Sequence, residues 1–99
     1  MAKVALTADF KVREGASQEI EAVFQELTDG VKSEEGNLVY TVCRSQKNEL
    51  EYTVFEIYES MEAAQTHRVA EHTKAAFAKL TLLLAAPPAI DMLEILSEV

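Results

Sequence analysis

The sequence contains two histidines, His67 and His72, which are the side chains best suited to exchange a proton near neutral pH. They are five residues apart, which on one continuous helix would place them about 140° apart around the axis. This spacing differs from the i, i+4 pair that binds zinc from one helix face, so we expect no metal site from the two histidines alone. A helix break between them would let both rings turn toward one cavity. Otherwise at least one ring is simply exposed.

Two glutamates are candidates to assist a histidine. Glu71 follows His67 by four residues and could share a proton or a ligand with it, although such pairs are usually solvated surface contacts. Glu56 alternates with Val54 and Tyr58 along a predicted strand. A carboxylate on a buried face is costly unless it is paired or hydrogen-bonded. The pattern favours a buried Glu56 over a solvent-facing one.

The other side chains that could take part in chemistry are more typical of structural positions. Tyr40, Tyr52 and Tyr58 are typical of amphipathic core residues with a satisfied hydroxyl group. Cys43 is the only cysteine, which excludes an internal disulfide and any metal site built from several cysteines, and we expect it to be a small buried residue. The sequence shows no catalytic triad, no paired catalytic carboxylates and no glycine-rich phosphate loop.

Length and composition predict one ordered domain that spans residues 1–99, because 48% of the residues are hydrophobic and 26% are charged. Seventeen acidic and nine basic residues give a net charge of −8, which repels phosphate backbones and anionic lipids. The longest apolar run is too short to span a membrane, and polar residues interrupt the N-terminal segment. We therefore expect no nucleic acid or membrane partner and a cytoplasmic location.

The first half of the chain predicts a strand and a helix. Apolar residues alternate with polar or small ones over residues 3–12, a period of two that indicates a strand with one buried face. Ser17 is placed to cap a following helix. The apolar stripe of that helix recurs at spacings of three and four residues and comprises Ile20, Val23, Phe24, Leu27 and Val31.

A hairpin is predicted next, with strands over residues 37–46 and 49–59 and a short turn at Lys47 and Asn48, where an asparagine can adopt a left-handed conformation at little cost. Both faces of this hairpin carry apolar residues. An antiparallel sheet in a small monomer usually exposes one face to solvent. Because both faces of this hairpin are apolar, each face has to be packed against another element. We expect helices on one face and a second copy of the chain on the other, as in an obligate homodimer.

Strong helix formers then run from Met61 to Ala86, with Ser60 as a predicted N-cap and two prolines after the end. A straight helix of this length, about 39 Å, is too long for the domain, so we expect a break near residues 68–71. Residues 89–96 are predicted to form a last strand that reaches toward the partner. The order βαββαβ predicts a ferredoxin-like α+β fold, with an antiparallel sheet and both helices on one face.

Three spaced groups of residues resemble the antibiotic biosynthesis monooxygenase (ABM) domain family. They are Glu34-x-Gly36-x-x-x-Tyr40, then Glu56-x-Tyr58-x-Ser60-x-x-Ala63-x-x-x-His67, and finally His72 followed five residues later by Phe77. The resemblance covers nearly the whole chain and implies a dimeric α+β barrel. The chain departs from many members by having Ala70-Glu71 where they carry Ser/Thr-Pro before the second histidine. It also lacks the tryptophan of the haem-degrading branch, which argues against haem cleavage.

The resemblance implies a cofactor-independent monooxygenase that oxidises a small quinol or polyphenolic aromatic with dioxygen. Such chemistry needs a base and a dry, mainly apolar pocket. The residues that would provide them are His67 or His72 as the base, Tyr40 and Tyr52 as donors or walls, Phe24 and Phe77 as apolar lining, and Glu56 on the same buried face. No metal or organic cofactor is expected.

Two other functions are compatible with the same resemblance. One is a non-catalytic dimeric barrel that binds a small hydrophobic or stress-related ligand. The other is an isomerase that acts on a small phosphorylated signal molecule. Oxygen uptake with a hydroquinone would distinguish the monooxygenase from both.

Overall fold

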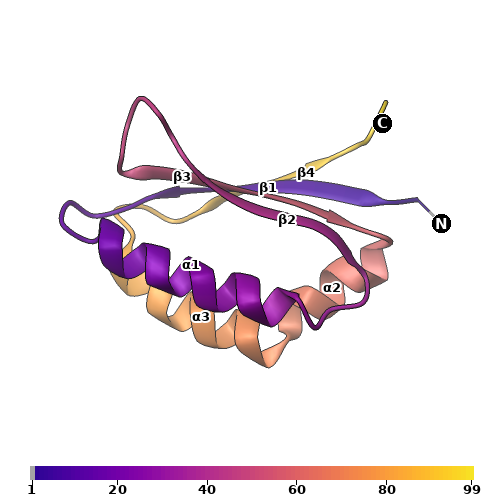
Figure 1. Cartoon of the computed structure of the whole chain (residues 1–99), viewed down its shortest axis with the longest axis horizontal. Helices are drawn as coiled ribbons and strands as arrows, with labels where there is room; N and C mark the ends of the chain where they lie inside the picture. The colour runs from indigo at the N-terminus through magenta and orange to yellow at the C-terminus, as the bar shows by residue number, and fades with distance from the viewer. Residues whose placement is uncertain (1) are drawn as a thin grey trace.

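The computed structural model describes residues 2–99 and contains one antiparallel sheet with helices on a single face (Figure 1). The sheet order is β2-β3-β1-β4. This arrangement confirms the ferredoxin-like α+β fold predicted from the element order. In chain order the elements are β1 (Val4–Lys11), α1 (Ser17–Val31), β2 (Asn37–Arg44), β3 (Glu51–Tyr58), α2 (Met61–Val69), α3 (Glu71–Leu83) and β4 (Ala89–Leu93).

The hydrophobic core lies between the inner face of the sheet and the pair α1 and α3. The predicted stripe of α1 is buried throughout and packs toward β1 and β3, where Phe10 meets Phe24 edge to face with ring centroids 5.3 Å apart. From α3, Leu80 is completely buried. The alternation predicted for β1 is confirmed in its second half, because Phe10 is buried while Asp9 and Lys11 are exposed. In the first half it is not, because Ala5 is buried and Leu6 is only half-buried.

The starts of α1 and α2 differ in how they are capped. Ser60 caps α2 as predicted, since its side chain accepts a hydrogen bond from the amide of Ala63 at 3.1 Å. Ser17 does not cap α1, which is a correction: it is the first helical residue, and Ala16 occupies the N-cap position without a side-chain bond. Gly15, with φ of 84°, makes the turn that brings the chain into α1.

The hairpin loop is wider than the predicted two-residue turn and covers residues 45–50. Asn48 is not left-handed, because no non-glycine residue among residues 2–99 has a positive φ. Side chains close the loop instead. The Ser45 hydroxyl accepts hydrogen bonds from the amides of Lys47 and Asn48, and the Asn48 side-chain oxygen accepts one from the amide of Leu50. These local bonds explain why a left-handed residue is unnecessary.

The predicted break in the long helix is present and falls at one residue. Ala70 has φ of −64° and ψ of 148°, an extended conformation, and separates α2 from α3. Its amide donates to the carbonyl of His67, which closes the last turn of α2. No proline is needed for this break, and α3 ends at Leu83, before the predicted end at Ala86.

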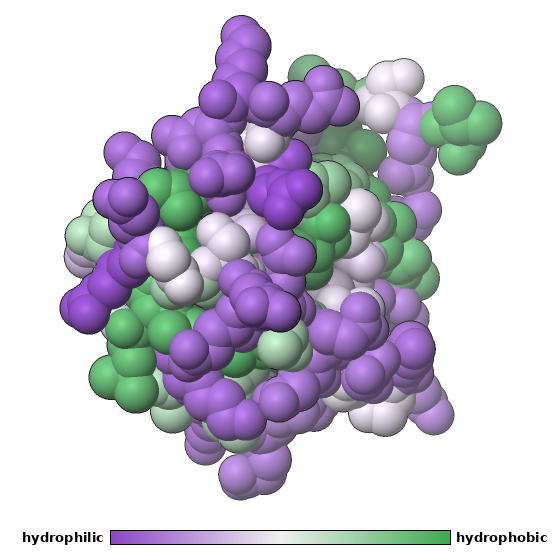
Figure 2. Space-filling model, turned by 60° about the vertical axis from the view of Figure 1, so that its left-hand side comes forward, coloured by the Kyte–Doolittle hydropathy of each residue, from purple (hydrophilic) through white to green (hydrophobic). Residues whose placement is uncertain are grey.

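The outer face of the sheet is not covered by any helix of the described chain (Figure 1). Phe55 and Leu93 are exposed there to 37% and 43%, beside half-buried Val39 and Ile57. Cys43 is also exposed, which corrects the expectation of a buried residue. Apolar side chains reach the surface among polar ones in the view of Figure 2.

The last strand is shorter than predicted, because β4 ends at Leu93 instead of residue 96. It pairs with β1 in antiparallel register, with Ile90 opposite Ala8 and Met92 opposite Leu6. Within residues 2–99, none of the helices has the length and apolar character needed to cross a lipid bilayer.

Candidate functional site

A cavity of about 490 Å³ lies between the sheet and the helices, and all four strands and all three helices contribute to its wall. Most of the lining is apolar, as in many small-molecule sites. The apolar residues are Leu6, Ala8, Phe10, Phe24, Leu27, Val54, Met61, Ala64, Phe77, Ile90 and Met92, and the polar ones are Tyr40, Glu56, Gln65, His67, Arg68 and Thr73.

His67 belongs to the last turn of α2, and its side chain is only 10% exposed. Its Nδ1 atom lies 2.8 and 3.0 Å from the two carboxylate oxygens of Glu34, a residue of the loop between α1 and β2. A carboxylate can only accept hydrogen bonds, so Nδ1 carries the proton. In the neutral ring Nε2 is then free to accept a proton, and it faces Glu56 at 3.7 Å.

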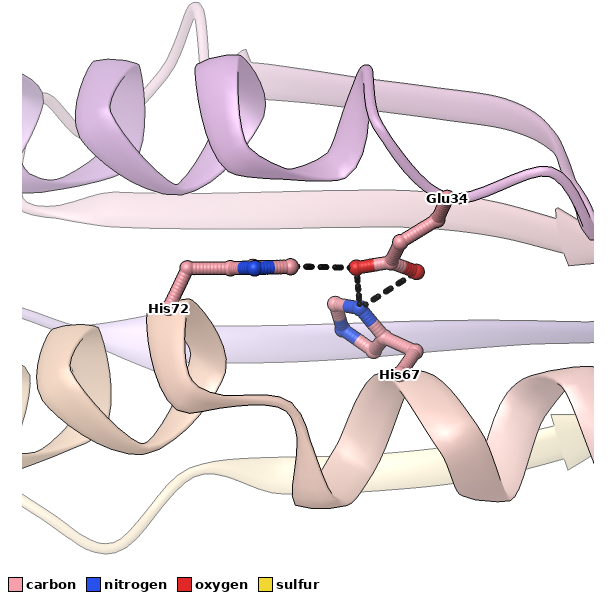
Figure 3. Close-up of side chains that lie close together, drawn as sticks. All are labelled: Glu34, His67 and His72. Carbon is pink, nitrogen blue, oxygen red and sulfur yellow. Dashed lines mark hydrogen bonds and ion pairs between the residues drawn. The ribbon is translucent and has the colours of Figure 1, made fainter.

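Glu34 also binds the second histidine. The Nε2 atom of His72, in the first turn of α3, donates to the same Glu34 oxygen that accepts from His67 (Figure 3). The His72 side chain is 28% exposed, and that of Glu34 is 11% exposed. Because Ala70 interrupts the helix, the two rings converge on one carboxylate instead of pointing 140° apart, the angle expected for a continuous helix.

Two glycines allow this convergence through close packing. A Cβ atom on Gly30 of α1 would lie 2.6 Å from Cγ of the His72 ring, and one on Gly36 would lie 2.4 Å from Cβ of Ala63. Gly30 therefore makes room for the ring of His72. Gly36 lets the loop that carries Glu34 lie directly against α2.

Glu56 is buried as predicted, with 5% exposure, and lies on the wall of the cavity. The hydroxyl of the fully buried Tyr58 donates to its Oε1 atom at 2.7 Å. Burial raises the pKa of the Glu56 carboxyl, and the Tyr58 hydrogen bond and the nearby His67 oppose that shift in part. The same burial raises the pKa of Tyr58, so its phenol stays protonated.

Tyr40 contributes a phenol to the cavity wall, with its ring centroid 5.9 Å from that of His67. Burial, followed by the nearby carboxylates of Glu56 and Glu34, raises the pKa of Tyr40. The phenol is therefore a hydrogen-bond donor at any physiological pH. Phe24 and Phe77 also line the cavity, which is where the sequence interpretation placed them.

Tyr52 does not belong to this cavity wall. Its ring packs against Phe24 with centroids 5.5 Å apart, and its hydroxyl donates to Glu21 on α1. The structure thus brings together His67, Tyr40 and Glu56 but leaves Tyr52 at a different place in the core.

Glu34 is the site residue that sequence reasoning missed, although it is part of the motif that carries the family resemblance. Glu71, four residues after His67, is exposed and makes no hydrogen bond or ion pair with it, which agrees with the solvated position expected for most such pairs. Glu34 reaches His67 and His72 across 33 and 38 residues of sequence. Local spacing contains no signal for such a contact.

The sequence profile of the family described as antibiotic biosynthesis monooxygenase matches residues 3–79. None of the curated proteins matches the chain significantly. Among solved structures, a candidate antibiotic biosynthesis monooxygenase from Caulobacter crescentus is 35% identical and superposes with a TM-score of 0.92 over 97% of this chain and 92% of its own.

Two further structures are similar. Rv0793 from Mycobacterium tuberculosis is 29% identical, with a TM-score of 0.92 over 98% of both chains. A protein from Methanosarcina mazei is 22% identical over 95% of this chain and 93% of its own, with a TM-score of 0.91, and shares the fold. Since the family profile covers well over half of its length, the chain belongs to the antibiotic biosynthesis monooxygenase family.

Proposed function

We propose that the protein is a cofactor-independent monooxygenase of a small quinol or polyphenolic aromatic, and that His67 is its base. The observation that supports this most directly is the position of His67 on the wall of an apolar cavity, with Nδ1 held by Glu34. That hydrogen bond selects the tautomer in which Nε2 can accept a proton.

The chemistry requires little else from the protein. Dioxygen reacts without a metal or a flavin only if the substrate is a good electron donor, and an ionised hydroquinone is one. After His67 takes the phenolic proton, the anion passes an electron to dioxygen, and the two radicals combine into a carbon-bound peroxide. Cleavage of the O–O bond leaves one oxygen in a new carbonyl group. The other oxygen departs as water, with the proton that His67 returns and the hydrogen lost from the carbon that carried the peroxide.

The remaining cavity residues fit the binding of such a substrate. A volume of about 490 Å³ suits one small aromatic molecule, and Phe24 and Phe77 offer apolar ring faces to it. Tyr40 can donate a hydrogen bond to a substrate oxygen. The apolar wall also excludes water, which would otherwise quench the peroxide.

We also propose that the working unit is a homodimer. The outer face of the sheet carries Phe55, Ile57 and Leu93 without a cover from the described part of the chain, and a second copy would bury them. An obligate interface of this kind buries about 2,000 Å² or more. Sedimentation at micromolar concentration should therefore show a dimer. A single species of 11.0 kDa, the mass of one chain, would contradict it.

Oxygen uptake with a panel of hydroquinones tests the activity. His67→Ala should lower kcat/KM by about 10²- to 10⁴-fold, the usual contribution of a general base, while the dimer persists. Uptake by the wild type should survive a chelator, because no metal takes part in the proposed step. If no hydroquinone is consumed although one binds with saturable affinity, the protein is a non-catalytic binding barrel and the monooxygenase assignment is wrong.

A further inference from the structure

The cluster of Glu34, His67 and His72 also has the donor set of a metal centre. One nitrogen from each histidine and one oxygen of Glu34 lie within 4.8 Å of one another, and they come from three separate elements. We propose that these three side chains bind one divalent transition-metal ion, with zinc as the model case, and that the ion competes with the proton held between His67 and Glu34.

The distances are close to those that a metal requires. Zinc binds nitrogen and oxygen at about 2.0–2.1 Å, so two ligands at a tetrahedral ion are about 3.3 Å apart. The contact from Glu34 to His67 Nδ1 is 2.8 Å long, and the contact from Glu34 to His72 Nε2 is 2.5 Å long. Each pair therefore has to open by less than about 1 Å, which is a small adjustment when an ion replaces two N–H protons. Three protein ligands leave a fourth position open for water or another small ligand.

A second carboxylate supports the histidine that is most buried. Glu56 Oε1 lies 3.7 Å from His67 Nε2, the nitrogen that would not bind the ion, and Tyr58 holds that carboxylate by a 2.7 Å hydrogen bond. Histidine ligands of metals usually donate their other N–H to a carboxylate, which orients the ring and makes it a better donor. The carboxylate of Glu56 faces this nitrogen, and since 3.7 Å is too long for a hydrogen bond, the ring has to move slightly toward Glu56 to form one.

The other histidine is held in place by packing. The ring of His72 lies so close to α1 that a Cβ atom on Gly30 would be 2.6 Å from its Cγ. Helix α1 therefore restricts the movement of the ring on that side before any ion arrives, which lowers the entropy lost on binding.

The charge of the cluster also favours a cation. Among residues 2–99 neither Glu34 nor Glu56 forms an ion pair with a lysine or an arginine, and histidines are their only basic partners. A divalent ion would balance these two carboxylates. Imidazole and carboxylate donors favour zinc and neighbouring first-row ions over magnesium, which prefers oxygen ligands and water.

Binding of the ion does not depend on the proposed monooxygenase activity, but it affects it if both exist. With the metal on Nδ1, His67 carries its proton on Nε2 and cannot act as the base. Zinc should therefore inhibit oxygen uptake, and a chelator should restore it.

Calorimetric titration of chelator-treated protein with ZnCl₂ tests the binding directly, and CoCl₂ provides visible absorption bands as an independent report of coordination. The wild type should bind one equivalent of zinc per chain, and MgCl₂ should produce no signal at the same concentration. His72→Ala, which removes the most exposed ligand, should weaken zinc binding by at least about 100-fold. Gly30→Ala keeps all three ligands but displaces the His72 ring, so it should weaken binding as well.

Glu35→Ala is the matched control, because Glu35 is the exposed neighbour of Glu34. It should bind zinc as the wild type does. Circular dichroism of each variant shows whether it is folded. Glu56→Gln removes no ligand, but it removes the carboxylate that faces His67, so it should weaken zinc binding by about 10- to 100-fold. Metal binding at this cluster is refuted if the folded wild type takes up no zinc, or if His72→Ala and the wild type bind zinc equally well.

Discussion

Replacing Glu34 by alanine should destabilise the fold, because this one side chain holds two imidazole rings together. The Nδ1 donor of His67 would lose its two short contacts and keep only the Thr73 hydroxyl at 3.4 Å, in a position where the side chain is only 10% exposed and water cannot readily replace the carboxylate. The donor of His72, with 28% exposure, would be compensated in part by solvent. The effect should therefore be dominated by His67.

Hydrogen bonds to charged groups contribute about 1.5–3 kcal/mol each. The full value for His67 and roughly half for His72 give a loss of about 2–4 kcal/mol, reduced somewhat because a buried carboxylate no longer has to be desolvated. In a domain of this size 1 kcal/mol corresponds to about 4–8 °C in Tm, so Tm should fall by about 8–30 °C.

Thermal unfolding followed by circular dichroism, in a buffer with chelator, measures this change. Glu35→Ala supplies the control, since an exposed residue should change stability by no more than about 0.5 kcal/mol. Glu34→Gln keeps one acceptor oxygen, so its Tm should lie between those of Glu34→Ala and Glu35→Ala. If Glu34→Ala melts within about 2 °C of the control, the two imidazoles do not depend on this carboxylate and the description of the cluster is wrong.

Three further predictions concern stability. Folding raises the pKa of Glu56, so the folded state holds the carboxyl proton more tightly than the unfolded state does. As the pH falls from neutral toward 4.5, the free energy of unfolding of the wild type should therefore rise relative to that of Glu56→Gln. Urea titrations at several pH values measure this difference. Ser60→Ala removes the N-cap bond of α2 and should cost about 1 kcal/mol, whereas Ser17→Ala, at a position without a cap bond, should cost less in the same titration. Gly36→Ala places a Cβ atom 2.4 Å from that of Ala63 and should lower Tm, and the double variant Gly36→Ala with Ala63→Gly should recover part of the loss.

The elements of this fold could be predicted because their signals are local. The period of two in β1, the stripe of α1 and the excessive length of the helix after Ser60 are each visible within a short window of sequence. The break at Ala70 was expected from length alone and occurs without a proline. The hairpin turn was predicted wrongly, because the side chains of Ser45 and Asn48 accept hydrogen bonds from backbone amides of the loop and make a left-handed residue unnecessary.

The site was only partly predictable. His67, Glu56, Tyr40, Phe24 and Phe77 were chosen from residue type and from the family resemblance, and all of them line the cavity. Tyr52 was chosen on the same grounds, yet its hydroxyl lies at the contact with Glu21 instead. The alternation of apolar residues along β3 correctly predicts that Tyr52 lies on the inner face of the sheet. Which part of the core the side chain reaches depends on its position along the strand, and alternation does not predict that.

The amino-acid sequence by itself determined the α+β class, the order of elements, the break between the two histidines and the burial of Glu56. Only the tertiary structure decided that Glu34 joins His67 and His72. That contact depends on how the loop after α1 lies against α2, which Gly36 permits, and on how closely α3 approaches α1 at Gly30. Local propensities act over a few residues, whereas these contacts span 33 and 38 residues and arise from the packing of both helices on one sheet.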